Sequence, residues 1–182
     1  GIWFSGGDQR RITEALLNTA VGRAVESAHQ RGAVVGGTSA GTACQSGLMI
    51  TGDGDFSIIA ADNVELWAGL GLFRGVVVDQ HFVARKRHNR LISVVLEHPE
   101  LLGVGVDEAT AVWVRPDGTF SVLGEGWVLV YDASNAEVRR GSRDASETPL
   151  GVHGMVTHVL LPGETFDVKT RTVVADLEDT GS

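Results

Sequence analysis

The segment GGTSAG at residues 36–41 constrains the fold of this chain more than any other segment. It follows the apolar run AVV at 33–35 and precedes small residues that favour a helix. A G-x-S-x-G pattern in this position is typical of a nucleophile elbow, a sharp strand-to-helix turn that needs small residues around its serine. We therefore predict Ser39 as a nucleophile and the Ala40 N–H as an oxyanion donor. The alternative is an ordinary Gly/Ser turn, because the chain has 24 glycines.

The composition indicates one compact domain. The chain has 182 residues, of which 43% are hydrophobic, and this is enough for a core. We expect the domain at 1–175 and a frayed polar tail at 176–182. The net charge of −8 provides no basic excess for nucleic acid or an anionic membrane, and no apolar run is long enough to span a membrane. Neither is predicted as a partner.

No cofactor or metal site is predicted. Cys44 is the one cysteine, so a disulfide framework and multi-cysteine metal sites are excluded, and we expect it to pack as a small hydrophobe. The segment TGDGD at 51–55 has some likeness to a calcium loop, but it lacks the distal glutamate. It therefore predicts an ordinary turn.

The start of the chain predicts a sheet that lacks strands on one side. Residue 1 is Gly rather than Met, and 2–4 predicts a strand that runs directly into a loop. Buried parallel strands need neighbours on both sides, so we expect the natural domain to begin upstream. A signal peptide would lie there too, and a cytoplasmic location is the default expectation.

The first half of the chain has the pattern of an α/β protein. Asp8 is the predicted N-cap of the first helix, and Gly32 is the glycine that follows its end. Short apolar runs between the helices are typical of buried parallel strands. We predict a mostly parallel sheet flanked by helices, with helices at about 9–31, 39–48 and 87–98, and strands at 34–35, 76–78 and 104–106.

The second half alternates apolar and polar residues, which predicts antiparallel strands. A hairpin is expected at 110–115 and 119–123, joined by the turn PDG at 116–118, and a further strand at 127–131. Residues 132–151 are polar and predict a loop. A second hairpin is predicted from 156–161 and 165–168.

Candidate catalytic groups follow the predicted strands, where ligands bind in open α/β sheets. His81 follows 76–78 and can serve as the base for Ser39, although it could also be an ordinary polar residue at a strand end. The group that orients this histidine is Asp107 or Glu108. Adjacent residues point to opposite faces of a strand, so only one can face the site, and the residues alone leave the choice open. The Gly7 amide is a second candidate oxyanion donor.

The basic run RKRHNR at 85–90 predicts a carboxylate clamp. Arg85, Arg87 and Arg90 present planar forks that can hold carboxylates bidentately. The alternative is a solvated first helical turn, but cations are mildly unfavourable at a helix N-terminus.

Four sequence blocks together resemble the cyanophycinase branch of the S51 serine peptidases. These blocks are GGDQ at 6–9, GGTSAG at 36–41, DQHF at 79–82 with the arginines that follow it, and GVGVDEATA at 103–111. They cover about residues 1–111, and the β-rich remainder is less distinctive. The resemblance implies a Ser39, His81 and Glu108 triad, and it selects Glu108 over Asp107. It also implies that the substrate pocket contains Gln9, Asp79, Gln80, Arg85, Arg87 and Arg90.

The resemblance also implies a substrate. Members of this branch cleave the polyaspartate backbone of cyanophycin, in which each aspartate carries an arginine, and release β-Asp-Arg dipeptides. They are often dimers, so a homodimer is expected, and they carry further chain upstream of the GGDQ block. Two alternatives stay open: an aspartyl or isoaspartyl dipeptidase of the same superfamily, and a non-catalytic relative that binds acidic or arginine-rich peptides.

Overall fold

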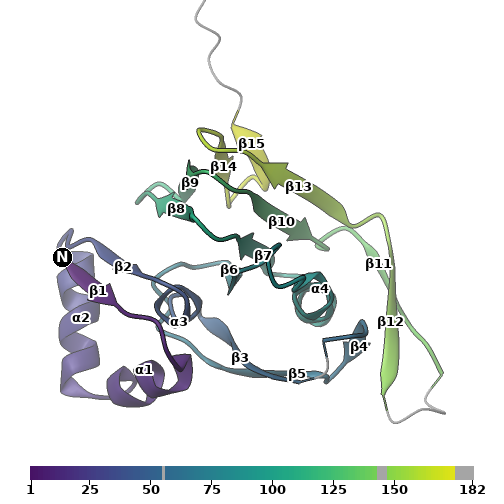
Figure 1. The fold of residues 1–182 in the computed structure, drawn as a ribbon, viewed down its shortest axis with the longest axis horizontal. Helices are drawn as coiled ribbons and strands as arrows, with labels where there is room; N and C mark the ends of the chain where they lie inside the picture. The colour runs from purple at the N-terminus through teal and green to yellow at the C-terminus, as the bar shows by residue number, and fades with distance from the viewer. Residues whose placement is uncertain (55, 143–146, 175–182) are drawn as a thin grey trace, which may run out of the picture.

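A computed structural model describes residues 1–54, 56–142 and 147–174 (Figure 1). The helices are α1 (Gln9–Leu16), α2 (Ala20–Gln30), α3 (Ala40–Ala43) and α4 (His88–Glu97). The strands of the first half are β1 (Ile2–Phe4), β2 (Val35–Gly37), β3 (Leu48–Gly54), β4 (Ala60–Ala61), β5 (Val64–Ala68), β6 (Val76–Gln80) and β7 (Leu102–Val106). Those of the second half are β8 (Thr110–Val114), β9 (Thr119–Gly124), β10 (Val128–Asp132), β11 (Glu137–Arg140), β12 (Thr148–His153), β13 (Val156–Leu160), β14 (Thr165–Asp167) and β15 (Thr172–Val174).

A four-stranded sheet of order β13-β10-β7-β6 lies at the centre of the fold. β6, β7 and β10 are buried on both faces, whereas the edge strand β13 is largely exposed, and consecutive side chains of β6 enter different cores. Val77 packs with Leu91 and Val94 of α4, whereas Val76 and Val78 pack in a second core with aromatic residues of β9 and β14. The sheet is thus held between α4 on one side and the β8–β9–β14 layer on the other.

The N-terminal elements form one end of the molecule, and the β11–β12 hairpin forms the other (Figure 1). β1 and β2 pair in parallel, with Phe4 opposite Gly37, and α3 contacts both strands. Trp3 and Val34 on this pair are largely exposed. The arrangement brings the loop after β1 next to the turn after β2.

The prediction of a mostly parallel sheet is wrong. Named strands pair in parallel only at β1–β2 and β6–β7 within the described ranges, and the other strand pairs are antiparallel. The reason lies in the connections, because parallel neighbours need a long crossover. The helix α4 supplies that crossover between β6 and β7. After β7 the chain makes the β8–β9 hairpin instead and returns in β10, which runs opposite to β7.

The predicted helix over 9–31 is two helices. Asp8 caps α1 by accepting a hydrogen bond from the Arg10 amide, as predicted, and Gly32 follows α2 with a φ of 93°. Between them Asn18 has a φ of 61°, and Thr19 begins α2 by accepting from the Gly22 amide. A left-handed residue followed by a threonine cap ends one helix and starts the next.

Several further predictions are wrong in the middle and at the end of the chain. The helix predicted at 39–48 ends at Ala43, and β3 and β5 form in segments with no predicted strand. The predicted loop at 132–151 contains β11 and the start of β12. The predicted hairpin at 156–168 does not form, because β13 pairs with β10 while β14 pairs with β9 and β15. The alternation of apolar and polar residues predicts that the segments at 156–161 and 165–168 are strands, but it does not specify which strands they pair with.

The predictions for the first three antiparallel strands are confirmed. β8 and β9 form the expected hairpin, and β10 follows at 128–132. The tail predicted at 176–182 lies outside the described residues. None of the helices in the described part of the chain is long and apolar enough to cross a membrane.

Candidate active site

The turn at Ser39 has the backbone of a nucleophile elbow. Ser39 lies between β2 and α3 with a φ of 54° and a ψ of −111°, which a non-glycine residue rarely adopts. A conformation of this kind costs of order 1–3 kcal/mol and persists only where its surroundings enforce it. A Cβ at Gly37 would lie 2.2 Å from the Gly41 carbonyl oxygen, and one at Gly41 would lie 2.2 Å from the Phe4 carbonyl oxygen. Both glycines of the G-x-S-x-G pattern are therefore required by backbone contacts.

Three side chains form a continuous hydrogen-bonded chain at this turn. Ser39 Oγ lies 2.9 Å from His81 Nε2, and His81 Nδ1 lies 2.9 Å from Glu108 Oε1. His81 follows β6 and Glu108 follows β7, and because these strands are parallel their carboxyl ends meet at one edge. When the Nδ1–H group donates a hydrogen bond to the Glu108 carboxylate, Nε2 carries no proton and accepts a hydrogen bond from the serine hydroxyl.

The structure separates the two adjacent carboxylates, Asp107 and Glu108. Asp107 Oδ1 accepts hydrogen bonds from the amides of Val83, at 3.1 Å, and Ala84, at 3.0 Å. It thereby fixes the turn that follows His81, while Glu108 contacts the imidazole. The sequence gives no sign of this role for Asp107, since its partners lie 24 and 23 residues away.

Left-handed backbone recurs around this chain of side chains. His81 has a φ of 51°, and Ala109, which follows Glu108, has a φ of 52°. A left-handed residue thus lies just after the end of each strand, where His81 contacts Ser39 and Glu108 contacts His81. The three side chains are partly open to solvent, with 24% of the His81 side chain and 57% of the Glu108 side chain exposed.

The two predicted oxyanion donors come from two segments next to Ser39: Gly7 from the loop after β1, and Ala40 from the start of α3. A Cβ on Gly6 would lie 3.5 Å from the Ser39 Cβ, so the loop after β1 rests against the nucleophile. Gly7 has a φ of 137°, which favours glycine. Within 1–54, 56–142 and 147–174, neither the Gly7 nor the Ala40 N–H donates a hydrogen bond. Both amides are therefore available to an incoming oxygen.

Asp79 and Arg90 form a buried ion pair with each other. Arg90 Nε donates to Asp79 Oδ2 at 2.6 Å, and Arg90 Nη2 makes a second, short hydrogen bond to Oδ1. The guanidinium also lies 4.9 Å from the centroid of the Phe56 ring. Only 1% of the Asp79 side chain and 3% of the Arg90 side chain are exposed. Asp79 and Arg90, both predicted as substrate ligands, thus pair with each other here, and Arg85 and Arg87 are the predicted clamp arginines outside this buried pair.

Arg87 and Arg85 differ in the contacts that their guanidinium groups make. Arg87 Nη1 donates to the Gln80 carbonyl oxygen at 2.7 Å and lies 3.6 Å from Asp79 Oδ1. Burial lowers the pKa of Arg87, the Arg90 charge lowers it further, and Asp79 opposes the shift. Arg85 is exposed, and its guanidinium has no hydrogen-bond partner in the described part of the chain. Of the three predicted clamp arginines, Arg85 is thus the one whose guanidinium is unpaired among the described residues.

The two predicted glutamines also differ. Gln9 Nε2 donates to the carbonyl oxygens of Ile50 at 2.8 Å and Thr51 at 2.6 Å, and so ties α1 to β3. Gln80 Oε1 is buried and has no hydrogen-bond partner among the described residues. A buried acceptor of this kind gains most from an incoming N–H donor.

Cys44 takes no part in this arrangement. Its thiol is fully buried at the end of α3, as predicted, and burial raises its pKa to about 12. No group of three or more His, Cys, Asp or Glu side chains in the described ranges could hold a metal ion. The side chains that meet at the elbow are those of a serine, a histidine and a glutamate.

Comparison with known proteins identifies the family. The model of peptidase family S51 matches residues 1–122. This chain belongs to peptidase family S51. Cyanophycinase from Trichormus variabilis is 37% identical over 175 residues, which cover 96% of this chain and 59% of that protein.

Two further relatives bear the same name. Cyanophycinase from Synechococcus elongatus is 36% identical over 174 residues, covering 95% of this chain and 54% of the relative. Cyanophycinase from Geminocystis herdmanii is 34% identical over 177 residues, covering 97% and 65% respectively. The chain thus spans between about half and two thirds of the length of these S51 relatives. The resemblance drawn from the four sequence blocks is confirmed at the level of the family.

Proposed function

We propose that this chain is the catalytic part of a serine exopeptidase that hydrolyses cyanophycin to β-Asp-Arg dipeptides. The observation that carries the proposal is the continuous path Ser39–His81–Glu108, with 2.9 Å at each contact. A hydroxyl needs an adjacent base to become a nucleophile, and that base needs an orienting acceptor. The names of the S51 relatives support the choice of polymer.

The proposed reaction passes through an acyl-enzyme. Ser39 Oγ attacks the scissile carbonyl carbon as its proton passes to His81 Nε2, and the Gly7 and Ala40 amides stabilise the oxyanion. The C–N bond then breaks, and His81 gives its proton to the leaving amine. Water attacks the resulting ester as one of its protons passes to His81; the C–Oγ bond then breaks as His81 gives that proton to Ser39 Oγ, and the carboxylic acid product leaves. Glu108 stabilises the imidazolium at both stages.

Substrate selection is proposed to depend on Arg85 and Gln80. Arg85 is exposed and free to pair with an aspartyl α-carboxylate. The unpartnered Oε1 of Gln80 can accept from a substrate N–H, such as that of a guanidinium. Arg87 donates to the Gln80 carbonyl oxygen, and Asp79 of the Asp79–Arg90 pair accepts from the Gln80 amide. These contacts hold the β6 backbone that carries Gln80.

Product analysis tests this proposal against its alternatives. The protein in its longest natural form is incubated separately with cyanophycin granules, β-Asp-Arg and Asp-X dipeptides, and the products are identified by mass spectrometry. β-Asp-Arg from granules supports the proposal. Cleavage of the dipeptides alone would instead indicate an aspartyl or isoaspartyl dipeptidase, and binding of granules without cleavage would indicate a non-catalytic relative. Ser39→Ala serves as the inactive control.

A further inference from the structure

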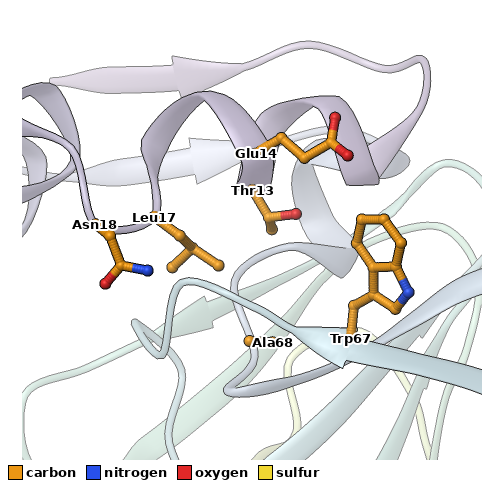
Figure 2. A pocket seen from close by; sticks show the side chains of 6 residues that line it. All are labelled: Thr13, Glu14, Leu17, Asn18, Trp67 and Ala68. Atoms are coloured by element: carbon orange, nitrogen blue, oxygen red, sulfur yellow. The ribbon is translucent and has the colours of Figure 1, made fainter.

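A groove of about 280 Å³ lies between α1 and β5, outside the candidate active site (Figure 2). The ring of Trp67 rises from β5 toward α1, Glu14 lies above it on the helix, and Asn18 lies at the other end (Figure 2). The remaining lining residues are Thr13, Leu17 and Ala68. The volume is at the lower end of the range for small-ligand sites, so it suits one extended side chain.

Three polar side chains of this groove, those of Glu14, Trp67 and Asn18, have no partners in the part of the chain that the structure describes, whereas the Thr13 hydroxyl donates to the carbonyl oxygens of Gln9 and Arg10. The Glu14 carboxylate makes no ion pair, and the Trp67 indole N–H and the Asn18 side-chain amide make no hydrogen bond. Other acids near α1 are compensated, because Asp8, Asp53 and Glu65 all lie within 4.0 Å of Arg10 nitrogens. The groove therefore combines a carboxylate that makes no ion pair with an aromatic wall.

We propose that this groove binds the guanidinium group of an arginine side chain. A planar cation can stack on the indole face of Trp67 while its N–H groups donate to the Glu14 carboxylate. An ammonium group is more strongly hydrated and lacks the planar fork, so lysine is expected to bind more weakly.

The position of the groove links it to the active site. The helix α1 begins at Gln9, two residues after Gly7, and Glu14 lies five residues further on, or about 8 Å along the helix axis. The source of the arginine rests on the proposed function, because a polymer with an arginine on every aspartate carries many copies of this group. One chain can then occupy the active site and the groove together, which strengthens binding through effective concentration.

An NMR titration tests the groove without any need for turnover. The full-length ¹⁵N-labelled protein is titrated with N-acetyl-arginine amide, and the indole N–H signals are followed, with Trp67→Phe used to assign the Trp67 signal. We expect a saturable shift of that signal, and about three- to tenfold weaker binding in Glu14→Gln. The control Glu137→Gln removes an exposed glutamate from β11 and should bind as the parent does. N-acetyl-citrulline amide, the neutral analogue, should produce no saturable shift.

Failure of the groove and failure of the proposed function give different results. An unmoved Trp67 signal, or equal affinity in Glu14→Gln, overturns the groove proposal whatever the protein hydrolyses. A saturable, Glu14-dependent shift in a protein that leaves cyanophycin intact supports the groove and rejects the proposed function. If cyanophycin is cleaved, Glu14→Gln should raise the KM for the polymer about three- to tenfold with kcat unchanged. An unchanged KM would overturn the role of the groove in polymer binding.

Discussion

The carboxylates of Asp79 and Glu108 lie near the carboxyl ends of the neighbouring strands β6 and β7, but in opposite surroundings. Asp79 is 1% exposed and fixed by Arg90, whereas Glu108 is 57% exposed and contacts the His81 imidazole. A buried pair cannot change its charge without a large desolvation cost. An exposed carboxylate beside histidine can stabilise a charge that appears and disappears during turnover. One edge of the sheet thus separates a fixed ion pair that stabilises the fold from a chain of side chains that can carry a proton.

The largest expected effect comes from removing the proposed nucleophile of the Ser39–His81–Glu108 path, and it is an effect on kcat. Ser39→Ala should lower kcat on the proposed substrate by about 10⁶-fold, as for nucleophile removal in other serine peptidases. Ser39→Gly should be equally inactive yet about 1 kcal/mol more stable than Ser39→Ala, because glycine tolerates the φ of 54°. Kinetics and urea unfolding of both variants measure these effects. Normal activity in Ser39→Ala would reject the proposed nucleophile.

The next effect tests the exposed carboxylate. Glu108→Gln should reduce kcat by about 10³-fold, since an amide can donate to Nδ1 and favour the wrong tautomer of His81. The unfolding free energy should stay close to that of the parent, because the side chain is largely exposed. The matched control is Glu137→Gln, which alters an exposed glutamate of β11 and should keep full activity. Equal kcat in both variants would contradict the role of Glu108.

The buried pair should respond in the opposite way. Arg90→Leu leaves Asp79 buried beside only the more distant Arg87, and should lower the unfolding free energy by about 3–5 kcal/mol. The double variant Asp79→Ala with Arg90→Leu should recover part of that loss, because no carboxylate is then left buried. Urea unfolding of the three proteins gives the comparison. A stable, fully folded Arg90→Leu with altered KM would instead favour a direct role in substrate binding.

A third carboxylate, Asp132, provides an intermediate case and the smallest expected effect. Burial would raise the pKa of Asp132, but hydrogen bonds from Ser134 and the charge of Arg171, 2.6 Å away, lower it below its usual 3.8. A lowered pKa in the folded state stabilises the fold above the unfolded pKa, and this stabilisation is lost as the pH falls through the folded pKa. The difference in unfolding free energy between the parent and Asp132→Asn should therefore be largest at neutral pH.

Urea unfolding at pH 7, 5 and 3 measures that dependence. We expect the two stabilities to stay well separated at pH 7 and 5, and to draw closer at pH 3, where the unfolded parent binds a proton at Asp132. A difference that stays constant down to pH 3 would show that the Arg171 contact adds no charge-dependent stability.

The sequence predicted local features of the elbow well, because they depend on local backbone chemistry. The strand, the turn and the glycines around Ser39 follow from close contacts that only glycine permits at Gly37 and Gly41. The cap at Asp8 and the β8–β9 hairpin are similarly local. By contrast, the pairing of β10 beside β7 and of β13 beside β10 depends on which strand the chain returns to. Alternating hydrophobicity does not encode that choice.

The candidate site shows the same division. The order of His81 and Glu108 along the chain placed both after strands, and their meeting at one edge follows from parallel pairing. The commitment of Arg90 to Asp79 was not predictable, because an arginine near a site has the same sequence pattern whether it is exposed or buried. Burial is set by the packing of α4 on β6 and β7, which is a tertiary property.

The backbone of β1 directly contacts the backbone of the elbow that carries the nucleophile. The carbonyl oxygen of Phe4 accepts a hydrogen bond from the Thr38 amide at 3.0 Å, and the same oxygen lies where a Cβ of residue 41 would be. No side chain lies between the strand and the elbow at this contact to absorb movement by changing rotamer. Close-packed backbone transmits displacement directly. A shift of β1, which lies at the edge of its sheet, therefore also moves the elbow and the Ser39 hydroxyl. The orientation of the nucleophile thus depends on how rigidly β1 is fixed in place.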